Sequence, residues 1–200
     1  MPDEPTAAPG QRADAQRNRE RILEAAAEAV REQGTQASLR DVARRTGVGL
    51  GTLYRHFPTR DALLEALLRT GFDHLAARAD ELLADRGPTP ERALADWLGE
   101  FTLRAGAFRG LPASLMATLG DPDSALHASC LAMREAGGRL LRAAQDAGAI
   151  RPDVDGTDLF ALVNALSWVA DQAPSIAARR AHLLTLITDG LAHPGTGARA

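Results

Sequence analysis

The sequence predicts an all-α protein, and three observations support this fold class. Apolar residues recur with the 3.6-residue period of amphipathic helices along most of the chain. Gly and Pro interrupt these stripes at spacings typical of helix ends. No segment shows the alternating apolar and polar pattern of a β-strand. We therefore expect about nine helices, divided between a small N-terminal domain and a larger C-terminal domain.

The first helix is expected to begin near Asp14 and to end at Gly34. Its apolar stripe consists of Ile22, Leu23, Ala26, Ala27 and Val30. Residues 1–13 are rich in Pro, Ala and polar side chains and are expected to form a disordered arm. They have no apolar core of the kind that defines a secretory signal.

Two short helices joined by a tight turn are expected next. Ser38 and Asp41 are spaced as a capping box at the start of the first. Gly47 suits the left-handed conformation that ends such a helix. The second helix places Leu53 and Phe57 on one buried side, four residues apart. This arrangement is a helix-turn-helix, whose second helix is built to lie in the major groove of DNA.

The charge distribution agrees with a DNA-binding N-terminal domain. The 200 residues carry a formal net charge of −3, so the whole chain is not basic. Residues 11–60 nevertheless hold ten Arg against six Asp and Glu, a net charge of +4. The rest of the chain holds thirteen Arg against twenty Asp and Glu, a net charge of −7. A basic segment on an acidic body is typical of a DNA reader attached to another domain.

The helix-turn-helix resembles the DNA-binding segment of the TetR family of transcriptional regulators. The resemblance is carried by Val42-Ala43, Gly47-Val48, the run Gly51-Thr52-Leu53-Tyr54-Arg55-His56-Phe57, and Leu63-Leu64. Gly49 stands where the family usually has Ser, so a hydroxyl that could bond a DNA phosphate is missing. Arg60 replaces the family's usual Lys and keeps the charge.

The motif and the resemblance together predict a set of DNA contacts. Tyr54 and His56 can donate hydrogen bonds to phosphate oxygens, whereas Leu50 and the Thr52 methyl group can touch thymine methyls. The resemblance assigns Arg40 to a base or phosphate contact. The alternative is that these are ordinary solvated side chains on a helical surface. The full set is Arg40, Arg44, Arg45, Leu50, Gly51, Thr52, Tyr54, Arg55, His56 and Arg60.

The rest of the chain is expected to form a larger helical domain over residues 59–193, followed by a flexible tail over residues 194–200. Together with the DNA-binding domain at 14–58, this completes the expected organisation. The expected helices are Arg60–Asp85, Pro90–Ala107, Leu111–Leu119, Asp123–Ala147, Asp155–Asp171 and Ser175–Ala192.

Glycines inside two of these helices need an explanation. Gly71 lies mid-helix, either as a bending point that couples ligand to DNA binding or because a neighbouring helix crosses closely there. Gly137-Gly138 is expected to be a weak spot in its helix.

The resemblance implies a small-molecule pocket in the large domain, between its long first helix and the next three. Arg104 is suited to fix an anionic group there. For each apolar member, ordinary core packing is the alternative interpretation. The candidate ligand contacts are Phe72, Leu75, Trp97, Phe101, Arg104, Phe108, Met116, His127, Cys130 and Met133.

The last two expected helices, Asp155–Asp171 and Ser175–Ala192, are apolar on more than one face. A surface helix of a monomer needs only one apolar stripe. The excess favours a homodimer through these two helices, as the resemblance also implies. The alternative is that both are buried within one subunit.

No enzyme motif is present, and the five His residues have no spacing typical of metal ligands. We expect no catalytic residues, no metal and no cofactor. Cys130 is the only cysteine, which fits the reducing cytoplasm, and no apolar run is long enough to span a membrane.

The sequence therefore predicts a cytoplasmic, homodimeric repressor that is released from double-stranded operator DNA by an unidentified small-molecule effector. One alternative is a helical small-molecule carrier or enzyme that retains the fold. Another is an activator or a corepressor-dependent regulator, which would use the same residues.

Overall fold

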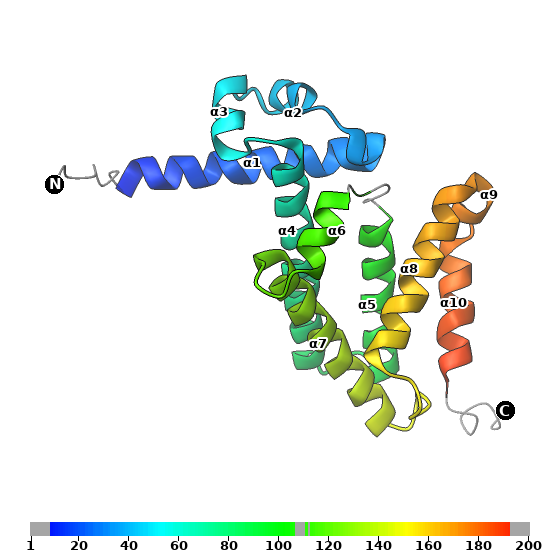
Figure 1. The fold of residues 1–200 in the computed structure, drawn as a ribbon. Coiled ribbons are helices and arrows are strands. Elements are labelled where there is room, and N and C mark those ends of the chain that lie inside the picture. Colours follow the sequence, from blue (N-terminus) through cyan, green and yellow to red (C-terminus); the bar gives the residue numbers. More distant parts are fainter. Residues whose placement is uncertain (1–8, 107–110, 112, 193–200) are drawn as a thin grey trace. The chain divides into compact units, whose positions relative to one another are not determined.

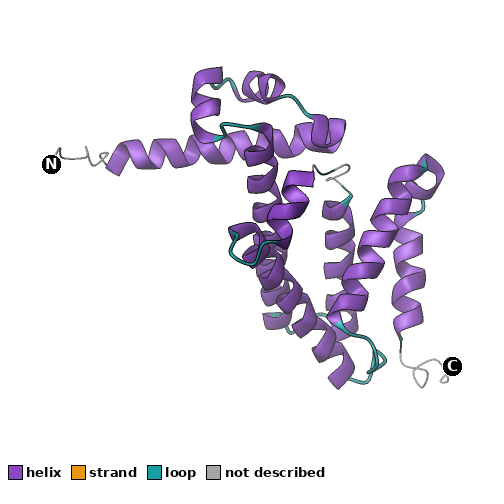
Figure 2. Ribbon diagram, in the orientation of Figure 1, coloured by secondary structure: helices purple, strands orange, loops and turns teal. Residues whose placement is uncertain are grey.

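The protein is helical throughout the part of the chain described by the structure, a computed structural model that covers residues 9–106, 111 and 113–192 (Figures 1 and 2). Within these residues the β-type pairing is limited to one isolated bridge, between Ile150 and Ala192. The predicted all-α class is confirmed. The helices are α1 (Pro9–Gln33), the 3₁₀ turn η1 (Gly34–Gln36), α2 (Leu39–Thr46), α3 (Leu50–His56), α4 (Arg60–Ala84), α5 (Pro90–Ala105), α6 (Ala113–Gly120), α7 (Ala125–Asp146), α8 (Gly156–Gln172), α9 (Pro174–Ala177) and α10 (Arg180–Leu191).

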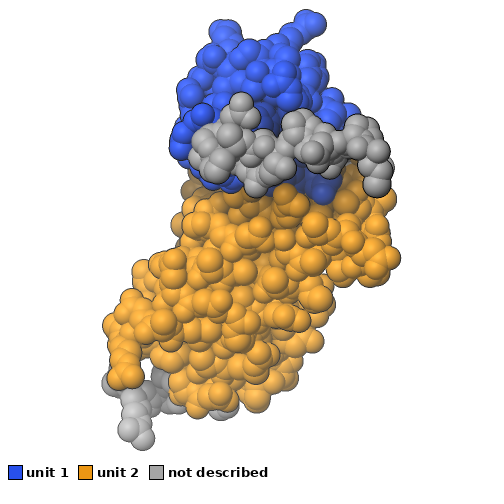
Figure 3. Space-filling view, turned by 90° about the vertical axis from the view of Figure 1, so that its left-hand side faces the viewer, with its two compact units in different colours: residues 1–67 blue, residues 68–200 orange. Residues whose placement is uncertain are grey.

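The chain divides into two compact units, residues 1–67 and 68–200, which are coloured separately in Figure 3. The division falls inside α4, so this helix contributes its first two turns to the first unit and the remainder to the second. Each unit has its own buried apolar core.

The core of the first unit forms where α1 packs against the two short helices. Ile22 and Ala26 of α1 are fully buried, as is Leu53 of α3. A hydrogen bond also links α1 to α2: the Arg21 guanidinium donates to the Thr46 carbonyl oxygen over 2.9 Å. The predicted stripe of α1 therefore faces the helix-turn-helix and holds it in place.

The core of the second unit is centred on Trp97 of α5. Its indole N–H donates to the Leu75 carbonyl oxygen of α4 over 2.8 Å, and its ring packs against Phe101 with centroids 5.5 Å apart. On the opposite side the ring lies over the backbone of Gly137 in α7. Trp97 thus joins three helices through one side chain that is 2% exposed.

The structure corrects three details of the expected helices. The first helix begins at Pro9, earlier than predicted. The expected helix over Ser175–Ala192 is two helices, α9 and α10, because the chain turns at residues 178–179. The expected capping box at Ser38 is incomplete: its hydroxyl accepts from the Arg40 N–H, but the Asp41 carboxylate is engaged elsewhere. A complete capping box caps α8 instead, formed by Asp155 and Asp158.

Gly71 lies in a continuous stretch of α4, and a Cβ atom added there meets no other heavy atom within 4 Å. The explanation by a closely crossing helix is therefore wrong, whereas the bending hypothesis stays a prediction.

We expect Gly71→Ala to raise the free energy of unfolding by about 1 kcal/mol, because Ala loses less backbone entropy in a helix. Chemical denaturation measures this change. A variant that is less stable than the wild type would contradict this expectation and show that a side chain at position 71 is unfavourable despite the open space around it. If α4 bends at Gly71, the same variant should also respond less to the effector.

Candidate nucleic-acid interface

The helix-turn-helix owes its shape to the residues of the turn. Gly47 adopts φ 67°, in the left-handed region, and ends α2 as predicted. The Thr46 hydroxyl then accepts a hydrogen bond from the Val48 N–H over 3.2 Å while it donates to the Val42 carbonyl oxygen. These local bonds set the direction in which the chain leaves α2 and enters α3.

Helix α3 is amphipathic in a way that turns four side-chain positions outward. Leu53 is fully buried, and Phe57, just after the helix, is 3% exposed. Arg19 of α1 covers the Phe57 ring, with its guanidinium carbon 5.5 Å from the ring centroid. The positions of α3 that are exposed to solvent are Leu50, Gly51, Tyr54 and Arg55. Thr52 and His56 are half-buried.

A recess of about 410 Å³ opens between the start of α2, the side of α3 and the first turn of α4. The Arg60 guanidinium donates to the Gln36 side chain over 2.9 Å at its edge. A phenol and guanidinium groups suit a phosphate group. The residues that line this recess are Gln36, Ala37, Ser38, Leu39, Arg40, Tyr54 and Arg60.

Arg44 and Arg45, which the sequence also predicts as DNA contacts, are engaged inside the unit. Both pair with Asp41, and Arg45 also pairs with Glu32 of α1 over 2.6 Å. The hydrogen bonds from Arg44 and Arg45 lower the pKa of Asp41 to about 2, so this carboxylate stays ionised at neutral pH. Arg44 remains 81% exposed on its side chain, whereas Arg45 is only 27% exposed.

Arg40 and Arg55 differ from this pair. Within the described residues neither guanidinium carries an ion pair, and both side chains are exposed. They are therefore the arginines of α2 and α3 with the most freedom to meet an external anion. The sequence alone does not distinguish Arg40 and Arg55 from Arg45, because Glu32, which pairs with Arg45, lies on a different helix.

The expected ligand contacts that the structure describes differ in how deeply they are buried. Leu75, Trp97, Phe101, Cys130 and Met133 are buried together in the core. The space next to Trp97 and Phe101 has a volume of only about 10 Å³, too little for a small molecule. Burial also raises the pKa of the Cys130 thiol, which keeps it unreactive.

The other expected ligand contacts lie nearer the surface. Met116 is 53% exposed and Phe72 is half-buried. The Arg104 guanidinium donates to Glu100 over 3.1 Å, and His127 Nδ1 lies 2.9 Å from the Leu119 carbonyl oxygen. Phe108 lies outside the described residues.

The Glu100 carboxylate interacts with three side chains of α4 and α5. His74 Nε2 lies 2.6 Å from its carboxylate, and Arg78 and Arg104 pair with the same group. Burial acts to raise the pKa of Glu100, but the hydrogen bonds from His74 and Arg104 outweigh it and leave the pKa lowered. His74 and Arg104 are thus held by a common carboxylate.

Helices α8 and α10 carry apolar side chains on their solvent side. Trp168 is 65% exposed and Leu186 is 54% exposed, and Leu162 and Val169 of α8 are exposed as well. Leu166, by contrast, is 7% exposed. The sequence pattern indicates that this helix is apolar over a broad arc but not which side packs inward, so it does not single out Trp168.

Among the described residues, no three His, Cys, Asp or Glu side chains gather closely enough to hold a metal ion. None of the described helices is both long and apolar enough to cross a bilayer.

Two family profiles match the chain. Residues 22–67 match the profile described as bacterial regulatory proteins of the tetR family. Residues 89–193 match the C-terminal domain of SbtR-like transcriptional regulators. The first match covers the helix-turn-helix and the start of α4, and the second covers α5 to α10.

Individual relatives agree with the profiles. The HTH-type transcriptional regulator UidR of Escherichia coli K12 is 30% identical over 150 residues, which cover 71% of this chain and 74% of UidR. The crystal structure of the TetR transcriptional regulator SCO0520 from Streptomyces coelicolor superposes with a TM-score of 0.71 at 36% identity and covers 88% of this chain and 99% of that one. A TetR regulatory protein from Mycobacterium vanbaalenii follows with a TM-score of 0.67, 35% identity and coverage of 91% and 99%.

Several curated relatives match over a shorter segment. The HTH-type transcriptional regulator SAR0097 of Staphylococcus aureus is 36% identical over 84 residues, which cover 40% of this chain and 44% of that protein. The chain thus spans less than half of the length of this relative.

Proposed function

Because the chain belongs to the tetR family of bacterial regulatory proteins, we propose that it is a homodimeric repressor that binds operator DNA and is released by a small molecule. The observation that carries this proposal is the outward face of α2 and α3, where the exposed Arg40 and Tyr54 line a recess of about 410 Å³ and Arg55 is exposed on α3. Family membership places the chain among regulators and not among enzymes.

The proposed contacts divide by the kind of DNA group they meet. Tyr54 and Arg60 line the recess at the start of α2, where a backbone phosphate would accept hydrogen bonds from both. Arg40 and the exposed face of α3, with Leu50 and Gly51, are proposed to meet base edges. Arg44 and Arg55 supply further charge near the backbone.

Thr52, His56 and Arg45 take smaller roles in this proposal. Thr52 and His56 are half-buried, so only part of each side chain is accessible to DNA. Arg45 is held by Asp41 and Glu32 and is proposed to brace α2 against α1. A contact from Arg45 to DNA would require that it leave both carboxylates.

We expect Tyr54→Phe and Arg40→Ala to weaken DNA binding in different ways. Loss of the Tyr54 hydroxyl should reduce affinity for every sequence alike, by about 0.5–1.5 kcal/mol, because phosphate contacts carry no base information. If Arg40 reads a guanine, Arg40→Ala should cost about 1–3 kcal/mol and relax the preference at one base pair. Fluorescence anisotropy with the DNA upstream of the chain's own gene, and with single-base variants, measures both.

The matched control is Arg86→Ala, which removes an exposed arginine from the second unit and should leave DNA binding unchanged. A changed base preference in Tyr54→Phe would rule out a pure phosphate role for that residue. Absence of specific binding by the wild-type protein would favour the carrier or enzyme alternative. Binding that appears only with an added small molecule would favour the corepressor alternative.

The dimer is proposed to form through the outward apolar face of α8 and α10. Trp168, Leu162 and Val169 on α8 and Leu186 on α10 expose a set of large apolar side chains, which is unusual for a monomer and common at an interface. Two recognition helices would then meet half-sites about 34–36 Å apart or a multiple of that spacing.

The effector is proposed to act on the second unit. Among the described members of the expected set, Met116 is exposed and Phe72, Arg104 and His127 are half-buried, so a ligand would reach these four before the core. A ligand that reaches Met133 or Cys130 must first displace Trp97, whose indole is bonded to Leu75. Such a ligand can release DNA only by binding the DNA-incompetent state more tightly.

A further inference from the structure

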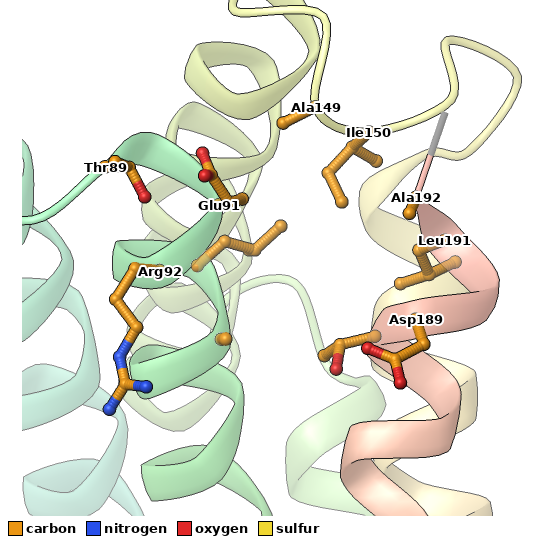
Figure 4. A pocket seen from close by; sticks show the side chains of 11 residues that line it. Thr89, Glu91, Arg92, Ala149, Ile150, Asp189, Leu191 and Ala192 are labelled. Atoms are coloured by element: carbon orange, nitrogen blue, oxygen red, sulfur yellow. The ribbon is translucent and has the colours of Figure 1, made fainter. Parts of the chain in front are cut away.

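A second space in the second unit is large enough for a ligand and contains none of the expected ligand contacts. It measures about 440 Å³ and lies between the start of α5, the loop after α7 and the end of α10 (Figure 4). Pockets of about 300–1,000 Å³ with mostly apolar walls and a few polar groups are typical small-molecule sites. All the residues that line it belong to the described part of the chain.

The apolar wall of this pocket is built into the core. Leu94, Ile150 and Leu191 line it and are 2%, 6% and 8% exposed. The Arg151 N–H donates to the Leu191 carbonyl oxygen over 3.0 Å, which ties the loop after α7 to the end of α10. The wall is therefore preformed and does not need to assemble around a ligand.

Two helices present their negative ends near this pocket. The macrodipole of a helix places partial negative charge at its C-terminus. Helix α10 ends at the pocket, and α7 ends just before Ala149. Neither helix has a basic residue in its last turn, so no side chain of its own neutralises that end.

Two side chains that line the pocket, Asp189 and Glu91, are also negatively charged. Asp189 turns its carboxylate toward α5 in Figure 4, and Glu91 lies in the first turn of α5, where it offsets the positive end of that helix. The one cation in the lining, Arg92, pairs with Asp96 of its own helix at 3.0 Å. In Figure 4 its guanidinium extends away from α10. The pocket thus combines an apolar wall with two carboxylates, whereas its one guanidinium is paired outside the lining.

We infer that this pocket binds a small organic cation, an ammonium group attached to an apolar body. The ammonium group lies at Asp189 on the α10 side, the apolar body covers Leu94, Ile150 and Leu191, and Glu91 adds negative charge from the α5 side. This binding does not depend on the proposed repressor function and can be tested without DNA.

The test uses benzylamine as the probe, with phenylacetate and benzyl alcohol as the anionic and neutral counterparts of the same ring. Titration calorimetry and saturation-transfer NMR on the full chain should show saturable binding of benzylamine that exceeds that of either counterpart. Asp189→Asn combined with Glu91→Gln should weaken benzylamine at least about tenfold, the effect expected from loss of charge-assisted hydrogen bonds. Both residues are exposed, so these substitutions leave the core intact.

The matched control is Asp73→Asn combined with Asp123→Asn, which removes two exposed carboxylates outside the pocket and should leave benzylamine binding unchanged. Ala149→Phe fills the space without changing a charge and should abolish binding. Equal binding of phenylacetate and benzylamine, or equal binding by wild type and the Asp189 and Glu91 variant, would overturn the inference. So would the absence of saturable amine binding to folded wild-type protein.

Discussion

The double variant Trp168→Glu with Leu186→Glu is expected to be a folded monomer whose affinity for a full operator is lower by about 10²- to 10⁴-fold, the usual gain from linking two binding modules. The physical reason is that two glutamates per subunit would be desolvated in an apolar interface without partners. Both positions are exposed in the single chain, at 65% and 54%, so the substitutions should change the stability of the isolated subunit little.

Sedimentation velocity at micromolar concentration measures the association, and anisotropy with a full operator and a half-site measures the binding. The half-site affinity should change little, because the DNA-binding face is untouched. Leu131→Glu is the matched control, since Leu131 is 47% exposed on α7 and lies on neither α8 nor α10. A double variant that stays dimeric, or a wild-type protein that is monomeric, would contradict the proposed interface.

The choice of positions matters, because the apolar residues of these helices do not all face the same way. Leu166 is 7% exposed and packs inside the subunit. Leu184 is half-buried and faces Gly99 of α5, where an added Cβ would lie 3.7 Å from its methyl carbon. A charge at Leu166 should therefore unfold the second unit and give no information on dimerisation.

The second large effect is expected at Gly137. A Cβ atom at this position would lie 2.4 Å from Cη2 of Trp97, far inside the contact distance. The indole is held in place, because it is bonded to Leu75 and packed on Phe101. Gly137→Ala should therefore lower the free energy of unfolding by about 1–3 kcal/mol, as overpacking of a core does.

Gly138 supplies the matched control one residue away in the same helix. A Cβ atom there would lie 3.5 Å from the Arg142 guanidinium, an ordinary contact with a flexible side chain. Gly138→Ala should thus stabilise the protein by up to about 1 kcal/mol. Combining Gly137→Ala with Trp97→Phe should recover part of the loss, because the smaller ring vacates the space.

Thermal and chemical denaturation measure these variants. Equal stability of Gly137→Ala and Gly138→Ala would show that Trp97 can yield. The helix α7 continues through Gly137-Gly138, as expected, and the expected weakness there stays a prediction; Gly137 lies where Trp97 approaches its backbone closely.

The candidate DNA-binding face was largely predictable from the sequence. Gly47, Leu53 and Phe57 shape this segment through interactions with residues close to them in sequence. The spacing of Gly and apolar residues is therefore enough to predict the turn and the buried side of α3. The exposure of Tyr54 follows from the burial of Leu53 on the other side of a short helix. The partner of Arg45 was not predictable, because Glu32 belongs to a separate helix.

Periodicity and turn chemistry were sufficient to determine that this protein is helical and where its helix-turn-helix lies, because those signals arise between neighbouring residues. The family resemblance rests on the motif residues themselves. The tertiary structure decided which apolar face is covered and which is left open. It placed Trp97 on Gly137, turned Trp168 outward and Leu166 inward, and brought Ile150 beside Leu191 at the pocket between α5 and α10. The physical reason is that a 3.6-residue repeat shows only that one face of a helix is apolar. Whether that face is buried depends on which other surface packs against it.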